Sequence, residues 1–178
     1  MDEKTLIQAC IRQERKAQRM LYDQFAGKMF AVCLRYVKSR EDAEDLLLEA
    51  FYKVFSNIER FKAEGSFEGW IRRIVVNECL MFLRKKHNFH MTLELNQVDE
   101  KVEASPVDNL VYEDIIKFLD QLPTGYRTIF NLYIIEGYKH REISEILNIS
   151  INTSKSQLIL AKKKLKGLLI KAQYPGVG

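Results

Sequence analysis

The sequence has little of what marks secreted or membrane proteins. Among its 178 residues are only three prolines and eight glycines, and no apolar run reaches the roughly 18 residues that a bilayer span needs. Its three cysteines, Cys10, Cys33 and Cys79, lie far apart and form no C-x-x-C pair, so neither a disulfide framework nor a zinc site is expected. The start, MDEKTLIQAC, is acidic and unlike a signal peptide. We therefore expect a cytoplasmic protein with reduced thiols and no direct membrane insertion.

Motifs that carry catalysis are missing as well. The sequence contains no G-x-S-x-G, no P-loop and no paired-carboxylate site. The best metal-like pair is His87 and His90, with Glu94 beyond, but a third ligand at adequate spacing is absent. We interpret His140 as a surface residue at a helix start rather than as a general base. The expectation is a protein without catalytic residues, cofactors or a bound metal.

Strand patterns are also lacking, because no alternating apolar and polar runs lie between turn residues. Apolar side chains recur instead at helical spacing, and 47% hydrophobic residues are enough for a packed core. The predicted helices cover residues 5–15, 17–37, 39–58, 67–86, 107–121, 124–135, 139–147 and a last helix from 151 onward. The predicted fold class is therefore all-α.

An acidic segment interrupts the helical pattern. Residues 91–109 contain five acidic residues and one lysine, a local net charge of −4, and such a segment buries little apolar surface. It ends in Ser105 and Pro106, a strong signal for the start of a helix. We therefore predict two small helical domains, 1–90 and 106–172, joined by an acidic linker at 91–105.

Two short helices with a tight turn between them are predicted in the second domain. Asn148 tolerates the left-handed conformation that ends a helix, and Ser150 is a good N-cap for the next one. In the last helix, Leu158, Ile159, Ala161 and Leu165 are predicted to face the core. The segment 139–171 has eight Lys or Arg residues against two acids, a net of +6. We rank DNA binding by this helix-turn-helix ahead of a purely structural hairpin. The candidate DNA-binding residues are Lys139, Arg141, Asn152, Thr153, Ser154, Lys155, Ser156 and Gln157.

The predicted helix 39–58 has a charged side opposite its apolar one. Asp42, Asp45, Glu49 and Lys53 recur at helical spacing there. A solvated helix face and a docking surface for a basic partner both explain this pattern. The residues alone leave the two readings open.

The helix 67–86 begins beside a cluster of aromatic residues. Trp70 is the only tryptophan, and it lies near Phe61 and Phe67 just after a loop that contains Gly65. Aromatic rings beside cations suit single-stranded nucleic acid, because unstacked bases stack on the rings. The same aromatic residues could equally form core, and basic residues favour any helix C-terminus. Residues alone leave this choice open too.

Three separate stretches carry a family resemblance: DAEDLLLEAFYKVF at 42–55, FKAEGSFEGWIRRIVVNECLMFLRKK at 61–86, and LPTGYRTIFNLYIIEGYKHREISEILNISINTSKSQLILAKKKL at 122–165. Together they resemble an extracytoplasmic-function (ECF) sigma factor of the sigma-70 family. The resemblance covers both domains in order, with the linker between them. It implies region 2 in residues 1–90 and region 4 in residues 106–172.

The resemblance also implies a function, partners and sites. It implies a subunit of core RNA polymerase that directs promoter-specific initiation, contacts the clamp of the largest subunit and the flap, and is restrained by an anti-sigma factor. The implied clamp-docking residues are Asp42, Asp45, Leu46, Glu49 and Phe51. The implied −10 DNA-binding residues are Phe61, Ala63, Glu64, Gly65, Ser66, Trp70, Arg73, Asn77, Arg84 and Lys85. The −35 element would be read by the helix-turn-helix residues named above, and the acidic linker resembles the segment that threads the polymerase channels.

The sequence departs from the family pattern at a few positions. Where members often read S-x-G-T-V-K-S-R, this chain has Asn152 for Gly and Gln157 for Arg, which bears on the −35 sequence preferred. Leu48 stands where a Gln commonly precedes the Glu of the docking helix. The alternative reading is a stand-alone helix-turn-helix regulator that never joins the polymerase, but such a protein needs neither the docking helix nor the Trp70 region.

Overall fold

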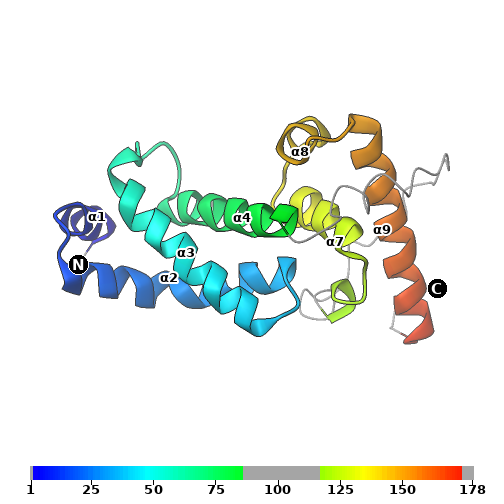
Figure 1. Ribbon diagram of the computed structural model, residues 1–178, viewed down its shortest axis with the longest axis horizontal. Coiled ribbons are helices and arrows are strands. Elements are labelled where there is room, and N and C mark those ends of the chain that lie inside the picture. The colour runs from blue at the N-terminus through cyan, green and yellow to red at the C-terminus, as the bar shows by residue number, and fades with distance from the viewer. Residues whose placement is uncertain (1, 86–116, 174–178) are drawn as a thin grey trace. The chain divides into compact units, whose positions relative to one another are not determined.

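The computed structural model describes residues 2–85 and 117–173 (Figure 1). Within these ranges the chain forms helices, turns and loops, and no strand is present. The chain divides into two compact units, Met1–Lys85 and Lys86–Gly178, each with its own internal contacts. The prediction of an all-α fold is confirmed. The boundaries predicted near residues 90 and 105 lie outside the described residues.

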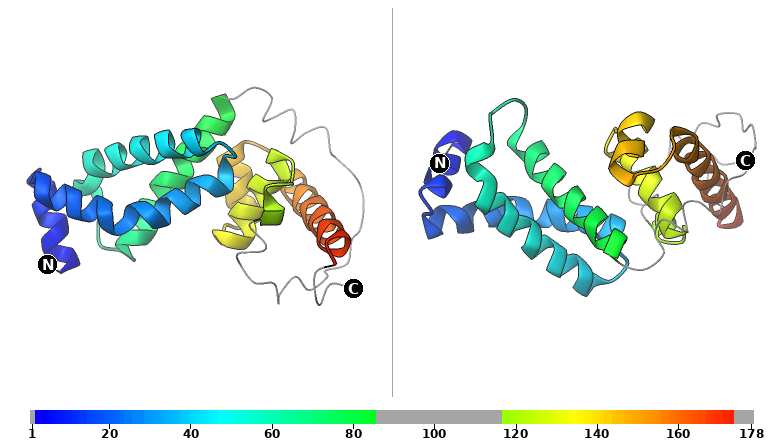
Figure 2. Two further views of the ribbon diagram at one scale, coloured as in Figure 1. Left: turned by 90° about the horizontal axis from the view of Figure 1, so that it is seen from below. Right: turned by 45° about the horizontal axis from the view of Figure 1, so that its top comes forward.

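Three long helices make up most of the N-terminal unit (Met1–Lys85). These are α2 (Arg15–Tyr36), α3 (Arg40–Asn57) and α4 (Phe67–Lys85), preceded by α1 (Glu3–Ile11), and the short 3₁₀ turn η1 (Ile58–Arg60) follows α3. Helices α2, α3 and α4 pack against one another in pairs, as the views of Figures 1 and 2 both show. The bounds agree with the predicted helices to within a few residues, and side-chain caps start several of these helices. The backbone N–H of Asp42, for example, donates to Ser39 Oγ at 3.1 Å.

The core of the N-terminal unit lies between these three helices. Met29 from α2, Val54 from α3 and Val75 from α4 are fully buried and represent the apolar sides of their helices. Burying side chains of this size stabilises a fold by roughly 1.5–3 kcal/mol each. The close packing fixes the rotation of α3 and α4 about their axes and so decides which of their residues face outward.

The C-terminal unit (Lys86–Gly178) is described from residue 117 onward. Helix α7 (Thr124–Phe130) continues directly into the π-helical turn η2 (Asn131–Ile135), which precedes α8 (His140–Leu147) and α9 (Ile151–Lys171). A single regular helix was predicted for 124–135, but the backbone N–H of Glu136 donates to the carbonyl of Asn131 at 2.9 Å. This wider turn ends at Gly137, whose φ of 76° favours glycine. Most of the predicted helix 107–121 lies outside the described residues.

Helices α8 and α9 form the predicted helix-turn-helix. Asn148 is left-handed, with φ 54° and ψ 51°, and ends α8. Ser150 caps α9 by accepting the backbone N–H of Thr153 at 2.9 Å. The turn therefore forms where the sequence predicted it. No helix among the described residues is long and apolar enough to cross a bilayer.

Candidate functional sites

The outward side of α3 combines acidic and apolar residues. Asp45, Leu48, Glu49 and Tyr52 follow one another at helical spacing and are exposed, with 59% of Leu48 and 74% of Tyr52 accessible. Large apolar side chains with this exposure beside carboxylates are suited to a partner that presents both apolar and basic groups. The acidic face predicted from the sequence therefore includes two apolar residues, and Tyr52 was missed although it lies one turn after Glu49.

Two of the predicted docking residues face the other way. Leu46 and Phe51 are only 3% and 2% exposed. The Phe51 ring packs edge-on against Tyr22 of α2, with ring centroids 4.8 Å apart. Both side chains belong to the core and are not exposed on α3, and their part in docking stays a prediction. Asp42 is half-buried at the start of α3.

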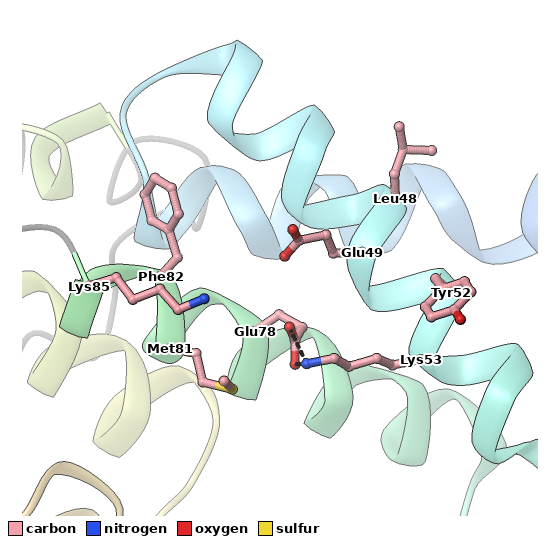
Figure 3. A pocket seen from close by; sticks show the side chains of 8 residues that line it. All are labelled: Leu48, Glu49, Tyr52, Lys53, Glu78, Met81, Phe82 and Lys85. Carbon is pink, nitrogen blue, oxygen red and sulfur yellow. Dashed lines mark hydrogen bonds and ion pairs between the residues drawn. The ribbon is translucent and has the colours of Figure 1, made fainter.

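A groove between α3 and α4 lies next to this surface (Figure 3). It has a volume of about 590 Å³. Lys53 Nζ contacts both carboxylate oxygens of Glu78, at 2.6 and 2.7 Å, and Glu78 is 8% exposed. The ammonium group of Lys53 therefore pairs with Glu78 of α4 and is not directed toward a partner together with the acidic residues of α3. The groove is lined by Leu48, Glu49, Tyr52, Lys53, Glu78, Met81, Phe82 and Lys85.

A second pocket, of about 340 Å³, lies where the loop after η1 meets the start of α4. Its aromatic side is made by Phe61 and Trp70, whose ring centroids are 5.7 Å apart. The Trp70 ring also stacks on Phe67, at 5.7 Å and an angle of 14°. Phe67 is buried, whereas Phe61 and Trp70 are half-buried, so both remain accessible from the pocket.

The loop beside this pocket is fixed by unusual backbone angles. Ala63 has φ 58° and Gly65 has φ 106°. Ser66 Oγ accepts the backbone N–H of Gly69 at 3.0 Å, which starts α4. The pocket itself is lined by Arg60, Phe61, Lys62, Glu64, Gly65, Ser66, Gly69, Trp70 and Arg73. Six of the ten predicted −10 residues are thus brought together, and Arg60 and Lys62 add positive charge that the sequence analysis missed.

The other predicted −10 residues are spread out. Ala63 is exposed in the same loop, and Asn77 is exposed one turn beyond Arg73. Arg84 and Lys85 lie at the far end of α4, about 20 Å along the helix from Trp70, and Lys85 lines the α3–α4 groove instead. These two cations form a separate surface.

On α9 three of the predicted DNA-binding residues are buried. Thr153, Ser154 and Gln157 are 5%, 0% and 0% exposed. They face the other helices of the unit and are not exposed on α9, so their contact with DNA stays a prediction. Asn152 and Lys155 are exposed and Ser156 is half-buried. Because residues 152–157 are all polar, the sequence suggested that all six face outward. Packing of α9 against α7 and α8 determines which of them are buried.

His140 connects the two helices of the helix-turn-helix. Its Nδ1 lies 2.9 Å from Ser154 Oγ, and its ring stacks on Tyr133 with centroids 4.3 Å apart. Burial lowers the pKa of His140, and the positive charges of Lys155 and Lys162 lower this pKa further. His140 is thus the first residue of α8, as predicted, and is half-buried because it also bridges α8 and α9.

Positive charge surrounds the exposed side of this motif. Lys139 and Arg141 are exposed at the start of α8, and Lys155 is exposed on α9. Arg141 makes only a long contact, 3.4 Å, to the exposed Glu145. Ile159 was predicted to face the core but is half-buried on the outer side of α9. In the ranges 2–85 and 117–173 no three His, Cys, Asp or Glu side chains gather into a metal site; His87 and His90 lie outside these ranges.

Comparison with known proteins identifies the family of this chain. Residues 21–89 match the model of Sigma-70 region 2, and residues 112–165 match that of Sigma-70, region 4. Sigma factor SigV of Bacillus subtilis is 30% identical, over 80% of this chain and 84% of SigV. This chain belongs to the ECF sigma factors of the sigma-70 family. It is a sigma factor, a non-catalytic subunit that directs RNA polymerase to initiate transcription at specific promoters.

Other relatives agree with this assignment. The ECF sigma factor SigE of Mycolicibacterium smegmatis is 29% identical over 85% of this chain and 61% of SigE. The ECF sigma-E factor of Haemophilus influenzae is 25% identical over 93% of this chain and 94% of its own length. Among solved structures, RpoE of Bartonella quintana, in complex with the anti-sigma factor NepR, has a TM-score of 0.53 at 21% identity, covering 85% of this chain and 96% of RpoE. CnrH, in complex with the cytosolic domain of CnrY, has a TM-score of 0.52 at 19% identity, covering 95% and 97%. These two structures support the fold.

Proposed function

We propose that this sigma factor divides promoter recognition between its two units. The N-terminal unit docks on the clamp of the largest polymerase subunit and reads the −10 element as single-stranded DNA. Helices α8 and α9 read the −35 element as a duplex, and the C-terminal unit contacts the polymerase flap. The observation that carries this proposal is the occurrence of two chemically different sites in the two units: an aromatic pocket beside α4 and a basic helix-turn-helix.

The outward side of α3 is proposed to contact the clamp. Asp45 and Glu49 offer carboxylates to basic side chains, and Leu48 offers an apolar contact between them. Apolar contact supplies affinity, while charge complementarity fixes the orientation of a partner and speeds its association. Leu48 also lines the α3–α4 groove together with Tyr52 and Met81, so the apolar part of this surface continues into the groove.

The pocket beside Trp70 is proposed to hold an unstacked base of the −10 element. A base that leaves the duplex loses stacking, so its pocket must replace that contact with aromatic surface. Phe61 and Trp70 offer such surface, and Arg60, Lys62 and Arg73 offer charge for the adjacent phosphates. Ser66 and the loop backbone add polar groups that suit the edge of a base.

The −35 element is proposed to contact the exposed residues of the helix-turn-helix. Asn152 and Lys155 lie near the N-terminus of α9, where recognition helices meet base edges. Lys139 and Arg141 are proposed to bind phosphates. The acidic segment 91–105 is proposed as the linker between the two units, because it resembles the acidic linker of the family.

We also propose that this sigma factor acts in the cytoplasm and is regulated there by an anti-sigma factor. One solved structure of similar fold, RpoE of Bartonella quintana, is a complex with the anti-sigma factor NepR. A second, CnrH, is a complex with the cytosolic domain of CnrY. An apolar groove flanked by charged residues, such as the one between α3 and α4, is suited to a helical partner. An anti-sigma factor that covered this groove would also cover Leu48 and Glu49 and would so compete with the clamp.

Charge reversal tests the docking surface directly. The variant Asp45→Lys with Glu49→Lys should no longer co-elute with core RNA polymerase in gel filtration, because two attractive contacts become repulsive. The control Glu3→Lys with Glu59→Lys changes net charge equally at two exposed acids elsewhere and should assemble normally. Circular dichroism melts of both variants check the fold. Normal assembly of the Asp45/Glu49 variant would contradict the proposed docking surface.

A further inference from the structure

One apolar residue lies within the charged outer side of α9. Asn152, Lys155, Ser156 and Ile159 follow the spacing i, i+3, i+4, i+7, which places them on one side of the helix. The opposite side is buried and consists of Thr153, Ser154, Gln157, Leu158, Ala161, Leu165 and Leu169. Ile159 is therefore directed away from the core, although its half-buried state shows that neighbouring side chains cover part of it.

Lysines flank Ile159 along the helix. Lys155 lies one turn before it and Lys163 one turn after it, and both are exposed. Lysine stems can cover apolar surface while their ammonium groups stay in water. A phosphate backbone that approached these two lysines would bring base edges toward the side chain between them.

The spacing matches a known reading geometry. The homeodomain recognition helix reads the major groove with four side chains at this same spacing of i, i+3, i+4 and i+7. In that groove thymine alone displays a methyl group, and apolar side chains recognise it by contact. An isoleucine in the fourth position has no polar atom to offer, so among the four bases its chemistry selects thymine.

We propose that Ile159 is a specificity-determining residue that contacts the C5-methyl group of one thymine in the −35 duplex. This inference rests on the proposed reading of −35 DNA by α9. It makes Asn152, Ser156 and Ile159 the base-reading residues of this strip, in place of the buried Thr153, Ser154 and Gln157. The lysines bind phosphates and set the position, while Ile159 contributes sequence preference.

Replacing thymine by deoxyuridine tests the contact, because it removes only the methyl group. The full chain, assembled on core RNA polymerase, would first select duplexes from a random library. Each thymine in the selected −35 duplex would then be replaced singly, and dissociation constants measured by fluorescence anisotropy. At one position the substitution should weaken binding of the unmodified protein about threefold to fourfold, the effect of losing one buried methyl group.

Two variants complete the cycle. Ile159→Ala should bind the thymine and deoxyuridine duplexes equally at that position, since the partner of the methyl group is gone. Ile170→Ala is the matched control: Ile170 is another isoleucine of α9, 49% accessible, but lies about 16 Å further along the helix. This variant should keep the full preference for thymine.

The outcomes separate the inference from the proposed function. Retained discrimination in Ile159→Ala, or no thymine whose methyl group matters, would overturn the role of Ile159 while −35 binding itself stood. Failure of the assembled protein to select any duplex would overturn the proposed reading of −35 DNA, and the inference with it. A thermal melt of each variant confirms that the comparison is between folded proteins.

Discussion

The imidazole of His140 and the hydroxyl of Ser154 lie 2.9 Å apart and join the two helices of the helix-turn-helix. Ser154 is completely buried and His140 is half-buried, so this hydrogen bond is partly buried within the motif. Stacking of His140 on Tyr133 fixes the ring from its other side. Together these contacts set the angle at which α9 and its exposed residues are presented.

Removal of this hydrogen bond should destabilise the C-terminal unit. We expect Ser154→Ala to lower the free energy of unfolding by about 1 kcal/mol, because the half-buried imidazole of His140 loses its hydrogen-bond partner. Urea denaturation followed by circular dichroism measures this. Ser156→Ala is the matched control, since its hydroxyl donates only to the carbonyl of Thr153 within the same turn, and it should cost less. Equal losses in the two variants would argue against a special role for the His140–Ser154 contact.

Protonation of His140 should weaken the fold in mild acid. Burial, Lys155 and Lys162 lower the pKa of His140 in the folded state, so between this pKa and the ordinary value near 6.5 the unfolded chain binds more protons. Stability should therefore fall as the pH drops below about 6.5 and level off once the folded protein is also protonated. His140→Asn should show a flatter profile from pH 7 to 5. A proton NMR titration that gave His140 a pKa above 6.5 would contradict this account.

The Lys53–Glu78 pair should act as a unit. Glu78 is 8% exposed and Lys53 is 41% exposed at the side chain, so Lys53→Met leaves a mostly buried carboxylate without its cation. We expect this change to cost about 1–2 kcal/mol, less than a fully buried pair would because solvent reaches the lysine. The double variant Lys53→Met with Glu78→Leu should recover most of the loss in a denaturation series. If the double variant were no more stable than the single one, the two residues would not be coupled.

Lys155 should contribute a phosphate contact. Lys155→Ala should weaken binding to −35 duplexes uniformly across sequences and reduce the slope of log K against log salt by about 0.9, the value for one phosphate. Lys171→Ala, at the C-terminal end of α9, removes the same charge far from the recognition end. It should leave the slope unchanged. A loss of equal size in both variants would indicate a general effect of charge.

Trp70 should matter most when the promoter must open. Trp70→Ala is expected to slow open-complex formation on duplex promoters, because an unstacked base loses an aromatic surface worth about 1–3 kcal/mol. If Trp70 acts at the step of duplex opening, a template that is already unpaired at −10 should remove most of the defect of Trp70→Ala. The ring also stacks on buried Phe67, so a thermal melt must accompany the assay. An unimpaired, folded variant would contradict the proposed base pocket.

Local signals in the sequence predicted much of this fold. The cap at Ser150 and the left-handed Asn148 act within a few residues, and both occur where expected. Burial depends on contacts between helices and was harder to infer. Leu46 and Phe51 belong to the sequence motif predicted to dock on a partner, yet their side chains pack into the core. On α9 the polar Ser154 and Gln157 are buried, whereas the apolar Ile159 is directed outward. The π-helical turn η2 had no signal that we recognised.

Transcription in vitro tests the proposed division of promoter recognition most directly. Core RNA polymerase, with and without this protein, would transcribe a library in which the −35 and −10 regions are randomised. We predict protein-dependent start sites that share two elements. Ile159→Ala should then relax only the upstream element, and substitution of Phe61 or Trp70 only the downstream one. Protein-dependent initiation in which the α9 variant altered the downstream element, or the pocket variants the upstream one, would contradict the assignment of the two sites.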